Sequence, residues 1–189
     1  EYKSLYNQNK NLIGWLEIAD TNIDYPVMQT ADNEYYLDHN INQEEDKNGT
    51  LFLDSACDVV KPSTNFIIYG HNMKSSAMFG SLKKYLDEEY WQSHKTIQFD
   101  TIYEKGTYIV TAVCLGKVEY QDDDVFRYYD FLNAESKKEF NVFKKNVEKS
   151  AVLADKEPIK YGDKLLTLST CNQYVENGRL YIVAKKIEQ

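Results

Sequence analysis

The stretch KLLTLSTC, residues 164–171, is the part of the sequence from which we predict both the fold and the site. Successive side chains of a β-strand point to opposite faces. The two faces are therefore Leu166, Leu168 and Thr170 on one side, and Leu165, Thr167, Ser169 and Cys171 on the other. The strand thus ends on a cysteine thiol, which is a candidate nucleophile.

The residues that follow Cys171 are expected to bring a permanently charged side chain, that of Arg179, close to it. Seven residues separate Cys171 from Arg179, and they include the turn dipeptide Asn177-Gly178. If a strand over 180–185 runs antiparallel to the first one, Arg179 begins it opposite Cys171. A planar guanidinium there can stabilise an oxyanion or hold a substrate carbonyl. The alternative interpretation is that Arg179, at the start of a strand, only forms a surface salt bridge. Such a bridge would stabilise the fold by under about 1 kcal/mol.

A histidine stands at the end of a second strand. The run NFIIY, residues 65–69, is almost continuously apolar, which favours a strand buried on both faces. It leads into Gly70-His71-Asn72, and residues that loops display at strand ends are favoured catalytic positions. A Cys–His pair works as a unit, because the imidazole takes the thiol proton and later returns it to a leaving amine. We therefore interpret Cys171 as the nucleophile and His71 as its acid/base partner.

The other cysteines and histidines are interpreted as structural. An isolated cysteine is usually an inert buried thiol, which is our interpretation of Cys57 and Cys114. His39 and His94 are interpreted as hydrogen-bonded structural residues. The odd total of three cysteines argues against a disulfide framework. No His or Cys pair has the close spacing of a zinc site, so we expect no metal.

The composition is that of an acidic globular chain of 189 residues, which we expect to form a single domain over 1–189. Its net charge of −8 repels phosphate backbones, which argues against a nucleic-acid partner. The acidic stretches 44–46 and 122–124 lack the ligand spacing of a calcium loop, so we interpret them as solvated loops rather than cation sites. Neither a run of about 18 apolar residues nor a signal peptide is visible.

Strand patterns are dense along the chain, and helical patterns are few. We predict about eight short strands, with helical segments over 2–11, 79–91 and 134–147. The last helix is the clearest, because its apolar residues recur at spacings of three and four. This density favours a mainly β fold, namely a closed or nearly closed β-barrel with helical insertions. An open α+β sandwich is the alternative.

The combination of these segments resembles the signature of the sortase family. In that signature a Thr-Leu-x-Thr-Cys strand end, here residues 167–171, precedes an arginine on the next strand, here Arg179. The segment YGHNM, residues 69–73, is similar to the sortase histidine segment, and the order His, Cys, Arg also matches. The resemblance extends over nearly the whole chain. The N-terminal helical stretch and the inserted helix Ala134–Val147 between two late strands resemble class B of the family.

This resemblance implies an eight-stranded sortase-type β-barrel and a cysteine transpeptidase. Cys171 would attack the carbonyl after the Thr of a sorting motif near the C-terminus of a surface protein, forming a thioester. An amine of a peptidoglycan cross-bridge or of a pilin lysine would then resolve it. His71 would transfer the protons, and Arg179 would bind the motif and stabilise the oxyanion. The hydroxyls of Ser169 and Thr170 would bind substrate, or would serve strand pairing only.

The resemblance also implies cofactors, partners and location. Class B relatives need no metal, so we expect neither a metal nor another cofactor. Class B members accept motifs built like Asn-Pro-x-Thr-x, and some prefer other leading residues. We expect the helix Ala134–Val147 and the acidic loop before it to frame the motif groove. We expect a monomer at the extracellular face of a Gram-positive cell membrane, held by an N-terminal anchor upstream of Glu1.

Other functions remain open at this point. An L,D-transpeptidase also places its His before its Cys, but in a Ser-x-Gly-Cys-x-Arg context; here no Gly precedes Cys171, and Arg179 is eight positions on. A papain-type thiol protease is disfavoured because its Cys precedes its His. A non-catalytic surface domain of the same shape is the remaining alternative, and the presence of Cys171, His71 and Arg179 argues against it.

Overall fold

The computed structural model describes residues 2–117, 126–171 and 178–187, and for Lys117 and Cys171 it describes the backbone alone. The strands are β1 (Leu12–Glu17), β2 (Asp24–Met28), β3 (Leu51–Leu53), β4 (Asn65–His71), β5 (Thr96–Thr101), β6 (Thr107–Lys117), β7 (Ala151–Ala154), β8 (Leu165–Cys171) and β9 (Gly178–Lys186). The helices are α1 (Lys3–Gln8), α2 (Glu88–Ser93) and α3 (Lys137–Ser150), with short 3-10 turns η1 (Tyr35–Leu37), η2 (Leu82–Leu86) and η3 (Tyr128–Asp130). Among the described helices, none is long and apolar enough to span a lipid bilayer.

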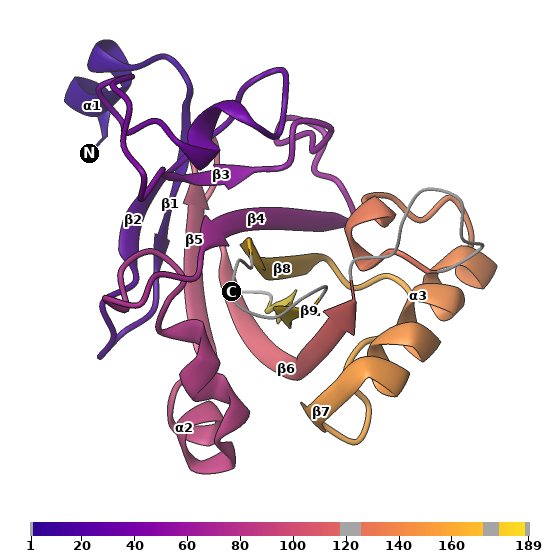
Figure 1. Ribbon diagram of the computed structural model, residues 1–189. Coiled ribbons are helices and arrows are strands. Elements are labelled where there is room, and N and C mark those ends of the chain that lie inside the picture. The colour runs from indigo at the N-terminus through magenta and orange to yellow at the C-terminus, as the bar shows by residue number, and fades with distance from the viewer. Residues whose placement is uncertain (1, 118–125, 172–177, 188–189) are drawn as a thin grey trace.

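Eight of these strands close into a barrel, which confirms the predicted fold (Figure 1). The hydrogen-bonded order is β5-β1-β2-β3-β4-β8-β9-β6, and pairing of β6 with β5 completes the ring. β7 pairs with β6 further along that strand. The open sandwich is excluded, because β5 hydrogen-bonds to β1 on one side and to β6 on the other.

The largest hydrophobic cluster fills the barrel, since all eight strands of the ring contribute side chains to it. Leu166 and Leu168 of β8 belong to this cluster, whereas Leu165 belongs to a second cluster outside the barrel. The predicted alternation of KLLTLSTC is thereby confirmed for its leucines. α3 lies outside the barrel (Figure 1). Its buried residues belong to the second cluster and form the apolar face expected from its spacing.

Local predictions differ from the structure in several places, and α1 is shorter than the helix expected over 2–11. Residues 79–91 form η2 and α2 instead of one helix, because Asp87 has an extended backbone and its side chain caps the N–H of Tyr90 at 2.8 Å. α3 begins at Lys137 rather than Ala134, since Ser136 acts as its N-cap. β7 was not predicted, because four residues are too few for a clear alternation.

Candidate active site

The two strands that carry the predicted nucleophile and base lie side by side. β4 and β8 pair in parallel through all seven residues of each, from Asn65↔Leu165 to His71↔Cys171. Paired strands lie about 4.8 Å apart, and paired residues share a face. His71 and Cys171 are therefore neighbours where both strands end. His71 is the last residue of β4, whereas we predicted it just past the end of a strand over 65–69. The side chain of Cys171 lies outside the described part of the chain.

Arg179 approaches this edge from the other side of β8. The antiparallel register of β8 and β9, continued by two residues, sets Arg179 opposite Cys171. Thr170 supports that continuation, because its Oγ1 donates to the Leu180 carbonyl at 3.0 Å and accepts from the Leu180 N–H at 3.3 Å. Within the described residues, the Nε of Arg179 is buried and has no hydrogen-bond partner. A guanidinium in this state can bind a substrate oxygen.

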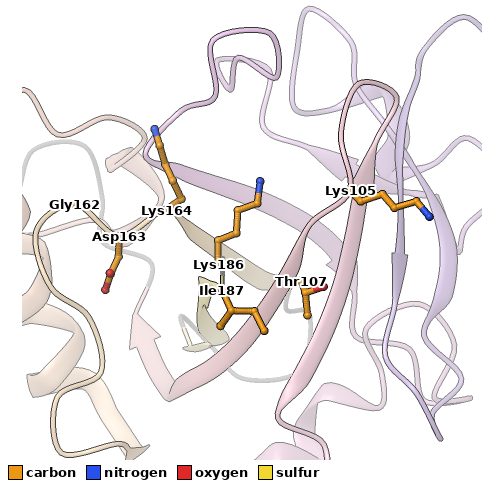
Figure 2. A pocket seen from close by; sticks show the side chains of 7 residues that line it. All are labelled: Lys105, Thr107, Gly162, Asp163, Lys164, Lys186 and Ile187. Atoms are coloured by element: carbon orange, nitrogen blue, oxygen red, sulfur yellow. The ribbon is translucent and has the colours of Figure 1, made fainter. Parts of the chain in front are cut away.

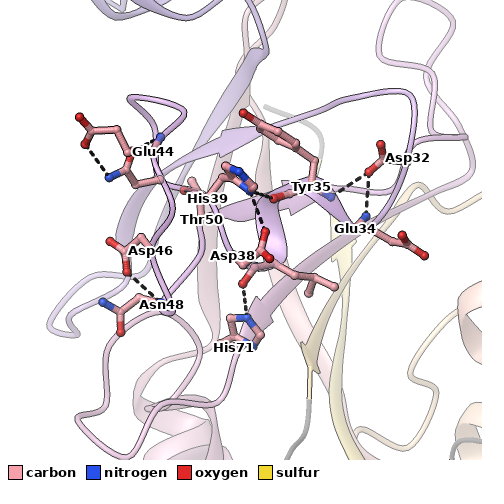
Figure 3. A network of polar contacts seen from close by, with 12 residues as sticks. Asp32, Glu34, Tyr35, Asp38, His39, Glu44, Asp46, Asn48, Thr50 and His71 are labelled. Carbon is pink, nitrogen blue, oxygen red and sulfur yellow. Dashed lines mark hydrogen bonds and ion pairs between the residues drawn. The ribbon is translucent and has the colours of Figure 1, made fainter.

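The imidazole of His71 is oriented by a backbone carbonyl (Figure 3). Its Nε2 lies 2.5 Å from the carbonyl oxygen of Leu37, the last residue of η1. A carbonyl oxygen only accepts, so this contact assigns a proton to Nε2. Nδ1 is then the nitrogen that can exchange a proton with a neighbouring thiol. No side-chain pattern marks such a contact, which is why the sequence did not predict it.

The segment that carries Leu37 is itself anchored (Figure 3). Asp32 Oδ1 accepts from the backbone N–H groups of Tyr35 and Glu34 at 2.8 and 2.9 Å, where η1 begins. These bonds, that of Tyr35 above all, lower the pKa of Asp32. On the far side, the N–H of Thr50 donates to the carbonyl of the residue before Leu37 at 2.9 Å. Leu37 therefore lies between two attachment points.

The hydroxyl residues of β8 are buried and hydrogen-bonded within the protein. Thr167 Oγ1 donates to Asn65 Oδ1 at 2.9 Å, and Ser169 Oγ lies 2.7 Å from the hydroxyl of Tyr128. Ser169 and Thr170 are only 0% and 1% exposed. If either hydroxyl bound substrate directly, one of these hydrogen bonds would have to break. Their role in substrate binding stays a prediction, and strand pairing stays its alternative.

The remaining cysteines and histidines have structural surroundings. Burial raises the pKa of Cys57 and of Cys114 to about 12. Both are therefore neutral thiols at physiological pH and poor nucleophiles. His39 and His94 each stack on a tyrosine ring, and the Nδ1 of each lies within hydrogen-bond distance of a backbone carbonyl.

Two of the pockets on the described surface bear on the location of a binding site. One, of about 350 Å³, lies between α3 and the segment around η3, and its lining includes Phe126, Phe131 and Phe143. The other, of about 390 Å³, is lined by three lysines (Figure 2). It adjoins the start of β8. The seven residues from there to Cys171 span about 23 Å at about 3.3 Å per residue. This pocket therefore lies at the opposite end of β8 from Cys171.

The lysine pocket does not form a focused anion site. The side chain of Lys105 points away from Lys164 and Lys186 (Figure 2). Lys186 already pairs with Glu104 at 3.0 Å, and Lys164 donates to a backbone carbonyl at 2.8 Å. Elsewhere in the described ranges, no group of His, Cys, Asp and Glu could hold a metal ion. The acidic stretch 122–124 lies outside the described residues.

Comparisons with known proteins agree in one family. The family model described as a sortase domain matches residues 16–187. Sortase B of Listeria monocytogenes is 34% identical over 192 residues, which cover 99% of this chain and 74% of that protein. The crystal structure of sortase B from Bacillus anthracis in complex with AAEK1 is 34% identical, with a TM-score of 0.86, and the match covers 100% of this chain and 84% of that one. A Staphylococcus aureus sortase B-substrate complex is 28% identical with a TM-score of 0.86, over 99% of this chain and 84% of that one.

Proposed function

We propose a catalytic centre of Cys171, His71 and Arg179 from one premise: the chain belongs to the sortase family, and to class B within it. The chain is therefore a cysteine transpeptidase, which cleaves a sorting motif after its Thr through a thioester and transfers the product to an amine. The observation that carries the proposed centre is the pairing of His71 with Cys171 where β4 and β8 end. The L,D-transpeptidase-like and non-catalytic alternatives gain no support.

In the proposed reaction, Cys171 is the nucleophile. Its thiolate sulfur bonds to the carbonyl carbon of the motif Thr, the C–N bond to the next residue breaks, and the leaving amine takes a proton from protonated His71. An incoming amine then loses its proton to His71 and attacks the thioester, which releases the Cys171 thiolate. Because the Leu37 carbonyl holds Nε2–H of His71 throughout, Nδ1 serves as the exchanging nitrogen. Arg179 neutralises the oxyanion of both tetrahedral intermediates.

The partners and the location are also inferred from membership of the family. Sortases act on sorting motifs and amine acceptors, and they are associated with the cell surface. For this chain we infer motifs of the form Asn-Pro-x-Thr-x, and an acceptor amine from a peptidoglycan cross-bridge or a pilin lysine. We place the groove between the Leu37 segment and η3, with α3 beside it, where the Phe126 pocket supplies an apolar wall. The chain acts as a single domain and a monomer, anchored N-terminally at the extracellular face of the membrane, without a cofactor.

The proposal is tested by incubating the chain with Asn-Pro-x-Thr-x peptides and searching by mass spectrometry for a thioester on Cys171. Cys171→Ala should abolish cleavage, and His71→Ala should nearly abolish it. Arg179→Ala should raise the barrier by about 3 kcal/mol, roughly a hundred-fold in rate. Arg179→Lys should recover only part of that loss, because an ammonium lacks the planar fork.

His94→Ala is the matched control, since it also removes an imidazole, but one that stacks on a tyrosine in the α2 region. It should retain full activity. Normal cleavage by Cys171→Ala would refute the mechanism, whereas normal cleavage by Arg179→Ala would refute the oxyanion role alone.

A further inference from the structure

A buried carboxylate ties together the segments that surround His71. Asp54, which follows β3, is 5% exposed. Its Oδ1 accepts from the N–H of Ala56 at 2.9 Å and so serves its own turn. Its Oδ2 points elsewhere: it accepts from the hydroxyl of Tyr69 at 2.9 Å and from Nδ2 of Asn33 at 3.1 Å. One side chain thus joins the end of β3, strand β4 and the segment before η1.

The stability of the turn does not account for this arrangement. A carboxylate that is buried without a cation is costly, and among the described residues no ion pair reaches Asp54. The turn needs only Oδ1, which a neutral amide would supply as well. Burial and the neighbouring carboxylate raise the pKa of Tyr69, so its hydroxyl stays protonated and donates to Oδ2. The second oxygen is therefore committed to Tyr69 and Asn33.

These contacts lead directly to the imidazole. Asn33 is clamped from both sides, because its Oδ1 accepts the N–H of Ser55 at 2.7 Å while its Nδ2 donates to Asp54. Four residues later the same segment presents the Leu37 carbonyl to His71 Nε2. We propose that Asp54 is a positioning residue, which latches the Leu37 segment to the barrel through Asn33 and thereby orients His71 for proton transfer. This inference rests on the proposed function of His71.

Asp54→Asn tests the latch with little change of shape. The amide oxygen can still serve the turn, and the new NH₂ can donate to the Tyr69 hydroxyl, but it faces the NH₂ of Asn33 as a second donor. We expect kcat for Asn-Pro-x-Thr-x peptides to fall about ten-fold with KM changed less than about two-fold, because misplacing a catalytic group lowers kcat more than binding. In ¹H–¹⁵N NMR of the same protein, the protected Nε2–H signal of His71 should be lost.

A polarity swap provides the rescue. In Asp54→Asn combined with Asn33→Asp, the amide at position 54 donates to a carboxylate at position 33, which can still accept the Ser55 N–H. This double variant should recover kcat and the Nε2–H signal. Tyr85→Phe is the control for a lost buried hydrogen bond, because Tyr85 donates to the His94 carbonyl at 2.7 Å in η2. It should lower stability without changing kcat or the His71 signal.

The outcomes separate the two proposals. Wild-type kcat and an unchanged His71 signal in Asp54→Asn would overturn the latch, and so would a folded double variant that recovers neither. Should Asp54→Asn fail to fold, Asn33→Ala breaks the same latch at a half-buried position and must reproduce both losses. Full activity of His71→Ala would refute the proposed function, while the NMR signal would still report whether Asp54 orients the ring.

Discussion

Burial separates the cysteines of this chain by reactivity. Cys57 and Cys114 lie in hydrophobic clusters, where burial raises the pKa of each to about 12. Cys171 ends β8 beside His71, and the register of β9 sets Arg179 opposite it. Positively charged groups near a thiol favour its deprotonated form, the thiolate. We therefore expect the reactivity of the native protein to reside in Cys171.

Alkylation tests this expectation. Iodoacetamide at about pH 8 should modify the native protein once, at Cys171, and should modify all three cysteines in denaturant. Peptide mass spectrometry locates the adduct. Cys171→Ala should remain unlabelled in its native state. Labelling of Cys57 or Cys114 at a comparable rate would contradict the raised pKa of these two thiols.

At the scale of elements, β8 is joined to its neighbours by buried side-chain hydrogen bonds as well as by its backbone ladder. Thr167 donates to Asn65 of β4, while Nδ2 of Asn65 donates to the Phe131 carbonyl at 2.9 Å. These contacts hold β4, β8 and the segment after η3 together, below the edge that carries His71 and Cys171. The hydroxyl of Thr167 thus contributes to the structure that supports the site.

Replacing Thr167 measures that contribution. Thr167→Val keeps the shape but leaves the Oδ1 of buried Asn65 without its donor, so the free energy of unfolding should fall by about 1–3 kcal/mol. Thermal and urea denaturation provide the measurement. Thr111→Val is the matched control, because its hydroxyl makes only a 3.4 Å contact with the Val183 carbonyl. An equal loss of unfolding free energy in both variants would show that the Thr167–Asn65 hydrogen bond contributes no more to stability than the contact of Thr111.

At the scale of the whole molecule, the closed barrel keeps many ionisable groups neutral. Besides the two buried thiols, burial raises the pKa of Tyr69, Tyr85 and Tyr108. The unfolded chain binds fewer protons than the folded one above the ordinary thiol pKa of 9.0. Stability from these groups is therefore fully present below about pH 9 and is lost as pH rises toward 12.

Calorimetry across this pH range tests the predicted direction of the change in stability. Under reducing conditions Tm should stay nearly level up to about pH 9 and then fall steeply. Cys114→Ala should be less stable at neutral pH, because it leaves a cavity. Its Tm should fall less steeply with pH than that of the parent, since one raised pKa is gone. Parallel curves for the two proteins would contradict the assignment to Cys114.

Much of the fold could be predicted because its signals are local. Alternation in KLLTLSTC separates Leu166 and Leu168, inside the barrel, from Leu165, beneath α3. The spacing of apolar residues in α3 identified its buried face. Predictions failed where one side chain decides the local structure: Asp87 interrupts the helix predicted over 79–91, and its capping bond can be read only from the folded backbone.

The candidate site divides in the same way. The sequence by itself determined which residue types stand at the strand ends, and the separation of only seven residues between Cys171 and Arg179 predicted that the two would lie near each other. Only the tertiary structure decided that β4 and β8 pair in parallel, which sets His71 beside Cys171 across 100 residues. It alone chose the Leu37 carbonyl as the partner of His71 and Asp54 as the anchor of that segment. The physical reason is that periodicity and short turns act between near neighbours, whereas every residue offers a carbonyl, and closure of the barrel selects which one meets the imidazole.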